Sequence, residues 1–302
     1  MKPTFFTGRT ARTTTVAIAS AAATAALTLP GLALAHGGHG QDGAVPAPPA
    51  APTSDSQIQN IDQVKTAIKA YYGDTVTSVA DPVDGATMLH QFSPTGAYAQ
   101  QTEGIANKAE HFLAKRAHHG HWKVHVKHAR HKNHAKPAIL FDIDDTTLNT
   151  YSYEIYSSFV YNPTSNAAFV NAGSASVFPA VPGMVDLEQK ALAEGYTVFF
   201  LTGRPHNATT DQTSGTLANL RDAGYSVVDS QVYLKDASGA TQPWLSTCAP
   251  SCTTTQYKSL TREHIESLGY DIVANFGDQF SDLNGGFADK TVKMPNPMYY
   301  LP

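Results

Sequence analysis

An α/β fold with a central parallel sheet is predicted for residues 137–302 on three observations. From residue 137 onward, apolar runs of strand length alternate with segments of helical periodicity. The apolar runs are nearly continuous, which is typical of parallel strands that are covered on both faces. Polar residues follow several of these runs, and ligands of such sheets bind where the carboxyl ends of the strands meet.

The first 35 residues have the pattern of a secretory signal peptide. Lys2, Arg9 and Arg12 precede an Ala-rich apolar run from Val16 to Leu34, and the sequence Ala33-Leu34-Ala35 fits a small-residue cleavage site. We therefore expect cleavage after Ala35 and a secreted protein without stable membrane insertion. An uncleaved membrane anchor is the alternative, since the run is just long enough to span a bilayer.

Residues 36–55 are predicted to be a disordered linker, because Gly, Ala, Pro, Gln and Ser dominate and offer little apolar area to bury. An N-terminal helical region is expected over residues 56–117. Its first helix is predicted over 57–72, with Ser56 as the cap and apolar residues at helical spacing. A second helix is predicted at about 102–117. Both form a helical extension of the main domain.

A His- and Lys-rich insertion is predicted at residues 118–136. Eight His lie between His111 and His134, and seven Lys or Arg lie between Lys115 and Lys136. It is interpreted first as a solvated polar insertion. Residues 118–134 could instead bind a transition metal, because His121, His125 and His128 would share one helical face. Adhesion to anionic surfaces at low pH is a third interpretation, since imidazoles gain charge on acidification.

The elements of the main domain are predicted from the same periodicity. A segment of loops and a helix is expected at 151–182, between the first strand and the first core helix. That helix begins at Pro182 and ends near Gly195. Strands are expected at 138–143, at 196–201, near 232–234 and at 272–276, and helices at about 182–194, 208–223 and 257–268.

Charge and cysteine content narrow the class of protein. The chain of 302 residues has 21 Lys and Arg against 25 Asp and Glu, a net charge of −4, which gives no reason to expect nucleic acid as a partner. Its two cysteines, Cys248 and Cys252, are predicted to form a short-loop disulfide in an oxidising compartment.

Acidic and polar side chains follow three of the predicted strands. An Asp-x-Asp pair on its own is a weak signal, but this one directly follows an apolar strand and is joined by a Gly-Asp-x-x-x-Asp sequence after another. Carboxylates gathered at one sheet edge would repel one another without a cation, and such oxygen ligands suit Mg²⁺. The three sequences are FDIDDT (141–146), LTGRP (201–205) and FGDQFSD (276–282).

These residues resemble the four motifs of the haloacid dehalogenase superfamily: Asp142-x-Asp144-x-Thr146, Thr202, Lys258 and Gly277-Asp278-x-x-x-Asp282. Within it, FDIDDTTL, VFFLTGRP, NFGDQFSDL and KMPNPMYY are similar to subfamily IIIB, the acid phosphatases grouped with plant vegetative storage proteins and bacterial class B enzymes. The resemblance implies a Rossmannoid three-layer fold with a small or absent cap at 151–182. It implies an Mg²⁺-dependent hydrolase of small phosphate monoesters.

The resemblance also implies a role for each motif residue. Asp142 would attack phosphorus and form an aspartyl-phosphate, and Asp144 would be the general acid and base. The carboxylates of Asp142 and Asp278 and the main-chain carbonyl of Asp144 would hold Mg²⁺, with Asp282 orienting that shell. The phosphoryl oxygens would be bound by Thr202, Gly203 and Lys258.

Alternatives remain for single residues and for the whole chain. Thr202 could simply cap a helix, Lys258 could be a surface lysine, and Arg204 could contact substrate or be structural. The same core could transfer the phosphoryl group to another alcohol instead of water. In a non-enzymatic interpretation, the His-rich insertion binds metal or a surface, and the core is its scaffold.

Overall fold

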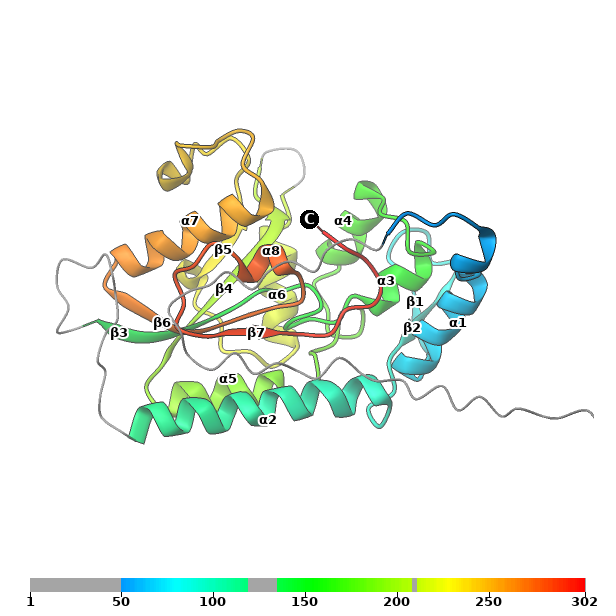
Figure 1. Ribbon diagram of the computed structural model, residues 1–302, viewed down its shortest axis with the longest axis horizontal. Helices are drawn as coiled ribbons and strands as arrows, with labels where there is room; N and C mark the ends of the chain where they lie inside the picture. Colours follow the sequence, from blue (N-terminus) through cyan, green and yellow to red (C-terminus); the bar gives the residue numbers. More distant parts are fainter. Residues whose placement is uncertain (1–49, 119–134, 208–210, 302) are drawn as a thin grey trace, which may run out of the picture. The chain divides into compact units, whose positions relative to one another are not determined.

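The computed structural model describes residues 50–118, 135–207 and 211–301, all within one unit, Gly38–Pro302 (Figure 1). The predicted signal peptide, most of the predicted linker and nearly all of the His-rich insertion lie outside the described residues. The transition-metal interpretation of residues 118–134 therefore stays a prediction. Among the described residues, no helix has both the length and the apolar character that a membrane crossing requires.

A five-stranded parallel sheet confirms the predicted α/β class. Its strand order is β5-β4-β3-β6-β7, so β3, which precedes the Asp-x-Asp pair, lies at the centre. Four of the strands correspond to predicted ones. The fifth, β7, is only three residues long, too short for periodicity to reveal. The strands are β3 (Lys136–Phe141), β4 (Thr197–Pro205), β5 (Val232–Lys235), β6 (Tyr270–Gly277) and β7 (Thr291–Lys293).

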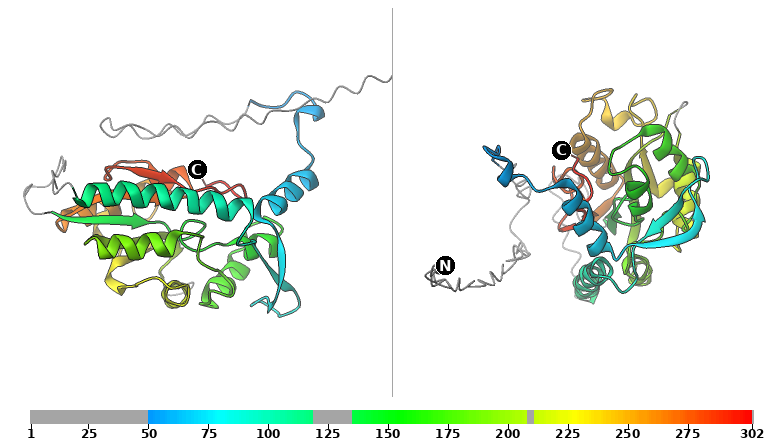
Figure 2. Two further views of the ribbon diagram at one scale, coloured as in Figure 1. Left: turned by 90° about the horizontal axis from the view of Figure 1, so that it is seen from below. Right: turned by 90° about the vertical axis from the view of Figure 1, so that its right-hand side faces the viewer.

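Helices cover both faces of this sheet, which gives three layers. Side chains alternate along β3, so Ile139 and Phe141 join one core while Ala138 and Leu140 join the other. The first core is covered by α2 (Ala97–His118) and α5 (Met184–Ala193), which pack side by side (Figures 1 and 2), together with α6 (Thr213–Asp222). The second core is covered by α7 (Thr254–Ser267).

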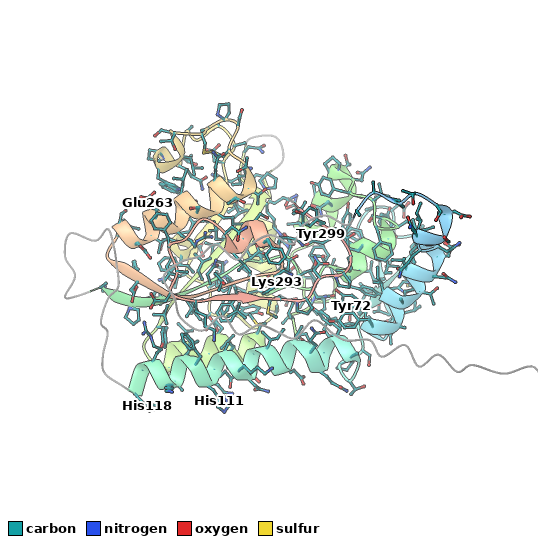
Figure 3. The ribbon with its side chains drawn as sticks, viewed as in Figure 1. Tyr72, His111, His118, Glu263, Lys293 and Tyr299 are labelled. Atoms are coloured by element: carbon teal, nitrogen blue, oxygen red, sulfur yellow. A yellow bond between two sulfur atoms is a disulfide. The ribbon has the colours of Figure 1, made fainter. Side chains whose placement is uncertain are left out.

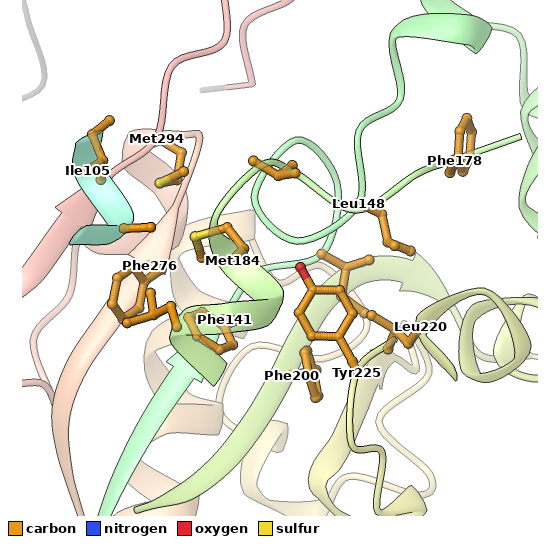
Figure 4. Packing of buried hydrophobic residues seen from close by; sticks show 14 of the residues in the cluster. Ile105, Phe141, Leu148, Phe178, Met184, Phe200, Leu220, Tyr225, Phe276 and Met294 are labelled. Carbon is orange, nitrogen blue, oxygen red and sulfur yellow. The ribbon is translucent and has the colours of Figure 1, made fainter. Parts of the chain in front are cut away.

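The larger core packs aromatic rings directly beneath the carboxyl ends of the central strands. Phe141 of β3 lies between Phe200 of β4 and Phe276 of β6, with ring centroids 6.0 and 4.8 Å away (Figure 4). All three rings are buried. Close packing of this kind leaves little freedom to the strand ends, so the residues that follow them are held in place.

The N-terminal region is only partly helical, which corrects the prediction for residues 56–117. Helix α1 (Ile61–Tyr72) is capped by Asn60, whose side chain accepts from the backbone N–H of Asp62 at 2.9 Å, and not by Ser56. A 3₁₀ turn, η1 (Asp55–Gln57), precedes it. An antiparallel hairpin, β1 (Thr75–Ala80) and β2 (Met88–Gln91), then separates α1 from α2.

The segment between β3 and α5 contains two short helices, α3 (Tyr151–Tyr156) and α4 (Pro163–Asn171). Loops and one helix were predicted here, and the structure has two helices, within the small or absent cap that the resemblance implies. Asn162 begins α4 by accepting from two backbone N–H groups, and Pro163 takes the first helical position. The remaining short elements are η2 (Asp229–Gln231), η3 (Pro243–Leu245) and α8 (Phe280–Leu283).

The predicted disulfide between Cys248 and Cys252 is present. It closes the turn between η3 and α7, ahead of a capping box in which Thr253 and Gln256 exchange side-chain and backbone hydrogen bonds. The bond therefore stabilises the loop that leads into the helix of Lys258.

Burial of Glu188 on α5 predicts a pH-dependent stability. Its side chain is fully buried, and one oxygen accepts from the backbone N–H of Ser226 at 3.1 Å, whereas the other has no partner among the described residues. Burial raises the pKa of Glu188 from 4.5 to about 7. Between about pH 4.5 and 7 the folded state binds a proton that the unfolded state has lost, so Glu188 lowers the free energy of unfolding as pH rises through this window.

At pH 7.5 the free energy of unfolding of the Glu188→Gln variant is therefore expected to exceed that of the parent by about 3 kcal/mol. At pH 4 the two values should differ little. Denaturant unfolding at a series of pH values measures both. Glu263→Gln, on the exposed face of α7 (Figure 3), is the matched control and should leave the pH profile unchanged. A Glu188→Gln profile parallel to that of the parent would contradict the assignment.

Candidate active site

Strand register brings the predicted motif residues to one edge of the sheet. Phe141 pairs with Phe200 on one side and with Phe276 on the other. Asp142 follows immediately, and its backbone N–H donates to the carbonyl of Phe276 at 2.9 Å. The three motif sequences predicted to follow strands therefore meet at the carboxyl end of the sheet, as expected. Two strands extend further than predicted: β4 continues to Pro205, so Thr202 and Gly203 lie within it, and β6 includes Gly277.

Three carboxylates form a buried cluster at this edge. Asp142, Asp278 and Asp282 each place an oxygen within 4.8 Å of the others. All three residues are at most 5% exposed. Gly277 makes this approach possible, because a Cβ there would meet Cβ of Asp282 at 2.4 Å. Any side chain at residue 277 would therefore push Asp282 out of the cluster.

Lys258 lies inside this cluster and is not a surface lysine. Its side chain is 2% exposed, and Nζ lies 2.5 Å from Oδ1 of Asp142 and 3.0 Å from Oδ1 of Asp282. Nζ also donates to the carbonyl of Leu201 at 2.5 Å. Because Lys258 is in the second turn of α7, the predicted helix carries the ammonium to the strand ends.

Burial and charge repulsion dominate the electrostatics of the cluster. Burial, followed by the charge of Asp282, raises the pKa of Asp142 above its ordinary value, and Lys258 opposes that rise. Burial and Asp282 also raise the pKa of Asp278. Burial lowers the pKa of Lys258, but the carboxylates of Asp142 and Asp282 outweigh it, so the net shift is upward. Lysine alone does not neutralise three buried carboxylates.

The donor set of this cluster fits a hard divalent cation. Its atoms are carboxylate oxygens, and no thiol or imidazole among the described residues joins them. A cation bound there would stabilise the ionised carboxylates, which burial and repulsion otherwise disfavour. The side chain of Asp144 lies outside the cluster, so Asp144 would contribute only its main-chain carbonyl, as the resemblance implies.

Arg204 holds the carboxylate of Asp144, a partner that the sequence did not reveal. The guanidinium donates from Nη2 to Oδ1 at 2.7 Å and from Nε to Oδ2 at 3.1 Å. Arg204 is itself buried, and its Nη1 donates to the hydroxyl of Thr216 at 3.0 Å. The paired geometry sets the direction of Asp144 in this structure, and Asp144 is the more exposed of the two side chains.

Thr202 and Gly203 lie next to these groups on β4. The hydroxyl of Thr202 accepts from the backbone N–H of Arg204 at 3.1 Å, and no helix begins at Thr202, so the helix-cap interpretation is wrong. Gly203 is exposed, and a Cβ there would have no heavy atom within 4 Å. The space that a side chain at residue 203 would occupy is therefore open to a small ligand.

Asp145 gives the loop after β3 its turn. Its φ of 53° lies in the left-handed region, which is costly for a residue with a Cβ. The buried carboxylate compensates by accepting from the backbone N–H of Thr150 at 3.1 Å and from its hydroxyl at 2.5 Å. This turn sends Asp142 and Asp144 toward the sheet edge while the chain continues into the cap.

Glu154 of α3 lies close enough to Asp144 for the two charges to interact. It is buried, and burial together with the nearby charge of Asp144 raises its pKa to about 7. Glu154 could not be predicted, because an isolated Glu in a Tyr-rich segment belongs to no motif.

A family model for the haloacid dehalogenase superfamily, subfamily IIIB (acid phosphatase), matches residues 86–302. The chain belongs to this subfamily. The match begins within the N-terminal region, so α1 and β1 lie outside it, whereas every residue of the carboxylate cluster lies inside it. Membership agrees with the three-layer fold and with the carboxylates at the ends of the central strands.

Similar proteins of the subfamily IIIB group come from plants. The chain is 35% identical over 173 residues to "Stem 28 kDa glycoprotein" of Glycine max, a match that covers 56% of this chain and 61% of the relative. It is 34% identical over 167 residues to "Acid phosphatase 1" of Solanum lycopersicum, covering 54% and 58%. The chain thus spans about three fifths of the length of these relatives.

Among solved structures, the class C acid phosphatase from Bacillus anthracis superimposes with a TM-score of 0.46 and 20% identity, covering 66% of this chain and 80% of that one.

Proposed function

We propose that this subfamily IIIB member is a secreted, Mg²⁺-dependent acid phosphatase that hydrolyses phosphate monoesters through an aspartyl-phosphate on Asp142. The observation that carries the proposal is the environment of Asp142, a buried carboxylate at the end of the central strand with the ammonium of Lys258 at 2.5 Å. A nucleophile needs such a fixed position and a nearby positive charge to approach an anionic phosphoryl group.

In the first step, a carboxylate oxygen of Asp142 attacks phosphorus, and the bond between phosphorus and the ester oxygen breaks. Asp144 gives its proton to the departing alkoxide, which leaves as an alcohol. Asp144 must turn from Arg204 toward the ester oxygen for this transfer. The guanidinium of Arg204 then becomes available to the phosphoryl oxygens, for which its planar donor pair is suited.

In the second step, water attacks the phosphorus of the aspartyl-phosphate, and Asp144 accepts the proton that this water loses. The bond between phosphorus and the Asp142 oxygen breaks, so inorganic phosphate leaves and the carboxylate is restored. The open space above Gly203 supports its assignment to phosphate binding together with Thr202 and Lys258. Fixed N–H, O–H and ammonium donors there would stabilise the charge that develops on the transferring group.

We assign Mg²⁺ to Asp142, Asp278 and the main-chain carbonyl of Asp144, with Asp282 as an orienting residue. Both carboxylate oxygens of Asp282 already have partners, Nζ of Lys258 at 3.0 Å and the backbone N–H of Gln279 at 3.0 Å, which favours the orienting role. When bound, Mg²⁺ supplies positive charge that offsets repulsion between the carboxylates and the phosphoryl group.

Secretion is proposed on the signal-peptide pattern of residues 1–35, and the disulfide between Cys248 and Cys252 is consistent with an oxidising compartment. Small phosphate monoesters are the proposed substrate class, because α3 and α4 are short and form no separate cap domain. Without a separate cap domain, the carboxyl edge of the sheet is accessible to substrates with varied leaving groups.

Metal removal tests the Mg²⁺ requirement. We expect a chelator to lower hydrolysis of p-nitrophenyl phosphate by roughly 10²-fold or more, since a phosphoryl-bound divalent cation is worth several kcal/mol. Addition of Mg²⁺ alone should restore the rate, because imidazoles of the His-rich insertion bind Mg²⁺ poorly. A chelated protein that keeps the full rate would contradict the metal assignment.

A further inference from the structure

The C-terminal segment 294–301, named here the C-terminal tail, contacts the carboxylate cluster. After β7 the chain (red) turns back and ends beside α8 (Figure 1). Figure 3 labels Lys293 at the start of this turn and Tyr299 near its end. From the tail, the side-chain amide of Asn296 donates to Oδ2 of Asp278 at 2.7 Å.

Gln279 supplies a second amide to the same carboxylate oxygen. Its Nε2 donates to Oδ2 of Asp278 at 2.6 Å. The tail fixes the direction of this amide, because Oε1 of Gln279 accepts from the backbone N–H of Leu301 at 3.0 Å. With its oxygen held by a backbone donor, the amide must present its nitrogen to Asp278.

Both donors reach Oδ2 of Asp278 and not Oδ1. Among the described residues, no hydrogen-bond donor reaches Oδ1 of Asp278. Two amide hydrogens on Oδ2 use the lone pairs of that oxygen and fix the plane of the carboxylate. The free oxygen is therefore directed by contacts that come from the tail, directly through Asn296 and indirectly through Leu301 and Gln279.

We propose that the C-terminal tail is a positioning element for the divalent cation: Asn296 and Gln279 orient Asp278 so that a single oxygen is presented to the ion. This inference rests on the proposed function, since it assigns Asp278 to Mg²⁺. Asn296 and Gln279 are positioning residues, because they act through Asp278 and touch neither substrate nor the reacting atoms. Partners of this kind typically change metal affinity 10- to 100-fold when they are lost.

Variants of the full-length chain separate this role from simple packing. Asn296→Leu keeps the approximate shape of the side chain and removes its donor to Asp278, together with the oxygen that accepts from the backbone N–H of Met298 at 2.9 Å. Leu301→Pro removes the N–H that holds Gln279, and Leu301→Ala, the matched control, shortens the same side chain but keeps the N–H. Titration calorimetry with Mg²⁺ on metal-free protein, and the Mg²⁺-dependent rise of Tm, measure binding without reference to activity.

We expect the Kd for Mg²⁺ to rise about 10-fold in Asn296→Leu and by a smaller factor in Leu301→Pro, and to stay at the parental value in Leu301→Ala. At saturating Mg²⁺, kcat of Asn296→Leu should return toward that of the parent. A folded Asn296→Leu with parental Kd would overturn the inference. If Asn296→Leu does not fold, the inference stands when Leu301→Pro binds more weakly than Leu301→Ala and fails when the two bind equally.

Failure of the proposed function has a different signature. A parental chain that neither binds Mg²⁺ nor gains Tm from it would remove the metal assignment, and this inference with it. If the parent binds Mg²⁺ and every tail variant binds it with the same Kd, only the inference about the tail is contradicted.

Discussion

Replacing Asp142 with asparagine is expected to lower turnover by several orders of magnitude, up to about 10⁶-fold, as seen when a catalytic nucleophile is lost elsewhere. The neutral amide is a poor nucleophile and cannot form the acyl phosphate, and the change removes one charged oxygen from the cluster. Folding should survive, because the change relieves repulsion among three buried carboxylates. Steady-state kinetics with p-nitrophenyl phosphate measures the loss.

Asp62→Asn, an exposed position on α1, is the control for the loss of one negative charge. It should keep the parental rate. The proposed mechanism would be wrong if Asp142→Asn, shown to be folded by circular dichroism, hydrolysed the ester at near the parental rate.

Replacing Asp144 with asparagine is expected to lower turnover of an alkyl phosphate by roughly 10²- to 10⁴-fold, the range typical of general acid–base catalysis. The variant keeps the nucleophile and the main-chain carbonyl, and loses only the proton carrier. p-Nitrophenolate leaves with little need of a proton, so the phosphoryl-transfer step should be impaired less with p-nitrophenyl phosphate. Single-turnover kinetics with the two substrates measures this difference.

The two aspartate variants should therefore differ in leaving-group dependence. Asp142→Asn should show no recovery with the better leaving group, because no leaving group replaces a missing nucleophile. Equal losses on both substrates for Asp144→Asn would count against its assignment as the acid.

The residues that meet at the carboxyl edge of the sheet were predictable, because their position depends only on where the parallel strands end. Apolar runs located β3, β4 and β6, and parallel strands place the residues that follow them at one edge. Asp142, Thr202 and Asp278 needed no further information to be brought together. Lys258 was harder, because its position in the second turn of a helix is equally compatible with exposure, and only tertiary packing decides between them.

Contacts between distant side chains could not be predicted in this way. Arg204 meets Asp144 and Asn296 meets Asp278 across 60 and 18 residues of sequence. Neither pairing leaves a periodic pattern, because each depends on the path of a loop. The sequence PNPMYY of the tail entered only through the family resemblance, which assigned no role to Asn296.

Two predictions for the N-terminal region were wrong: the residue that caps the first helix, and the absence of strands between the two helices. Ser56 and Asn60 are both acceptable helix caps, and the chain uses Asn60, leaving Ile58 and Ile61 exposed by 61% and 66%. The hairpin of β1 and β2 was missed although Thr75–Ala80 is rich in β-branched residues. Strands β1 and β2 pair only with each other. Because most of β1 is exposed, its apolar and polar residues do not alternate clearly enough to predict a strand.

The most direct test of the central claim is chemical trapping of the phosphorylated carboxylate. The protein would be mixed with a phosphate monoester, denatured rapidly in acid and reduced with tritiated borohydride, which converts an aspartyl-phosphate to homoserine. Peptide mapping should then find tritium at residue 142, only when substrate was present, and none in Asp142→Asn. Substrate-dependent label at a different residue, or active turnover with no labelled aspartate under these conditions, would contradict phosphoryl transfer to Asp142.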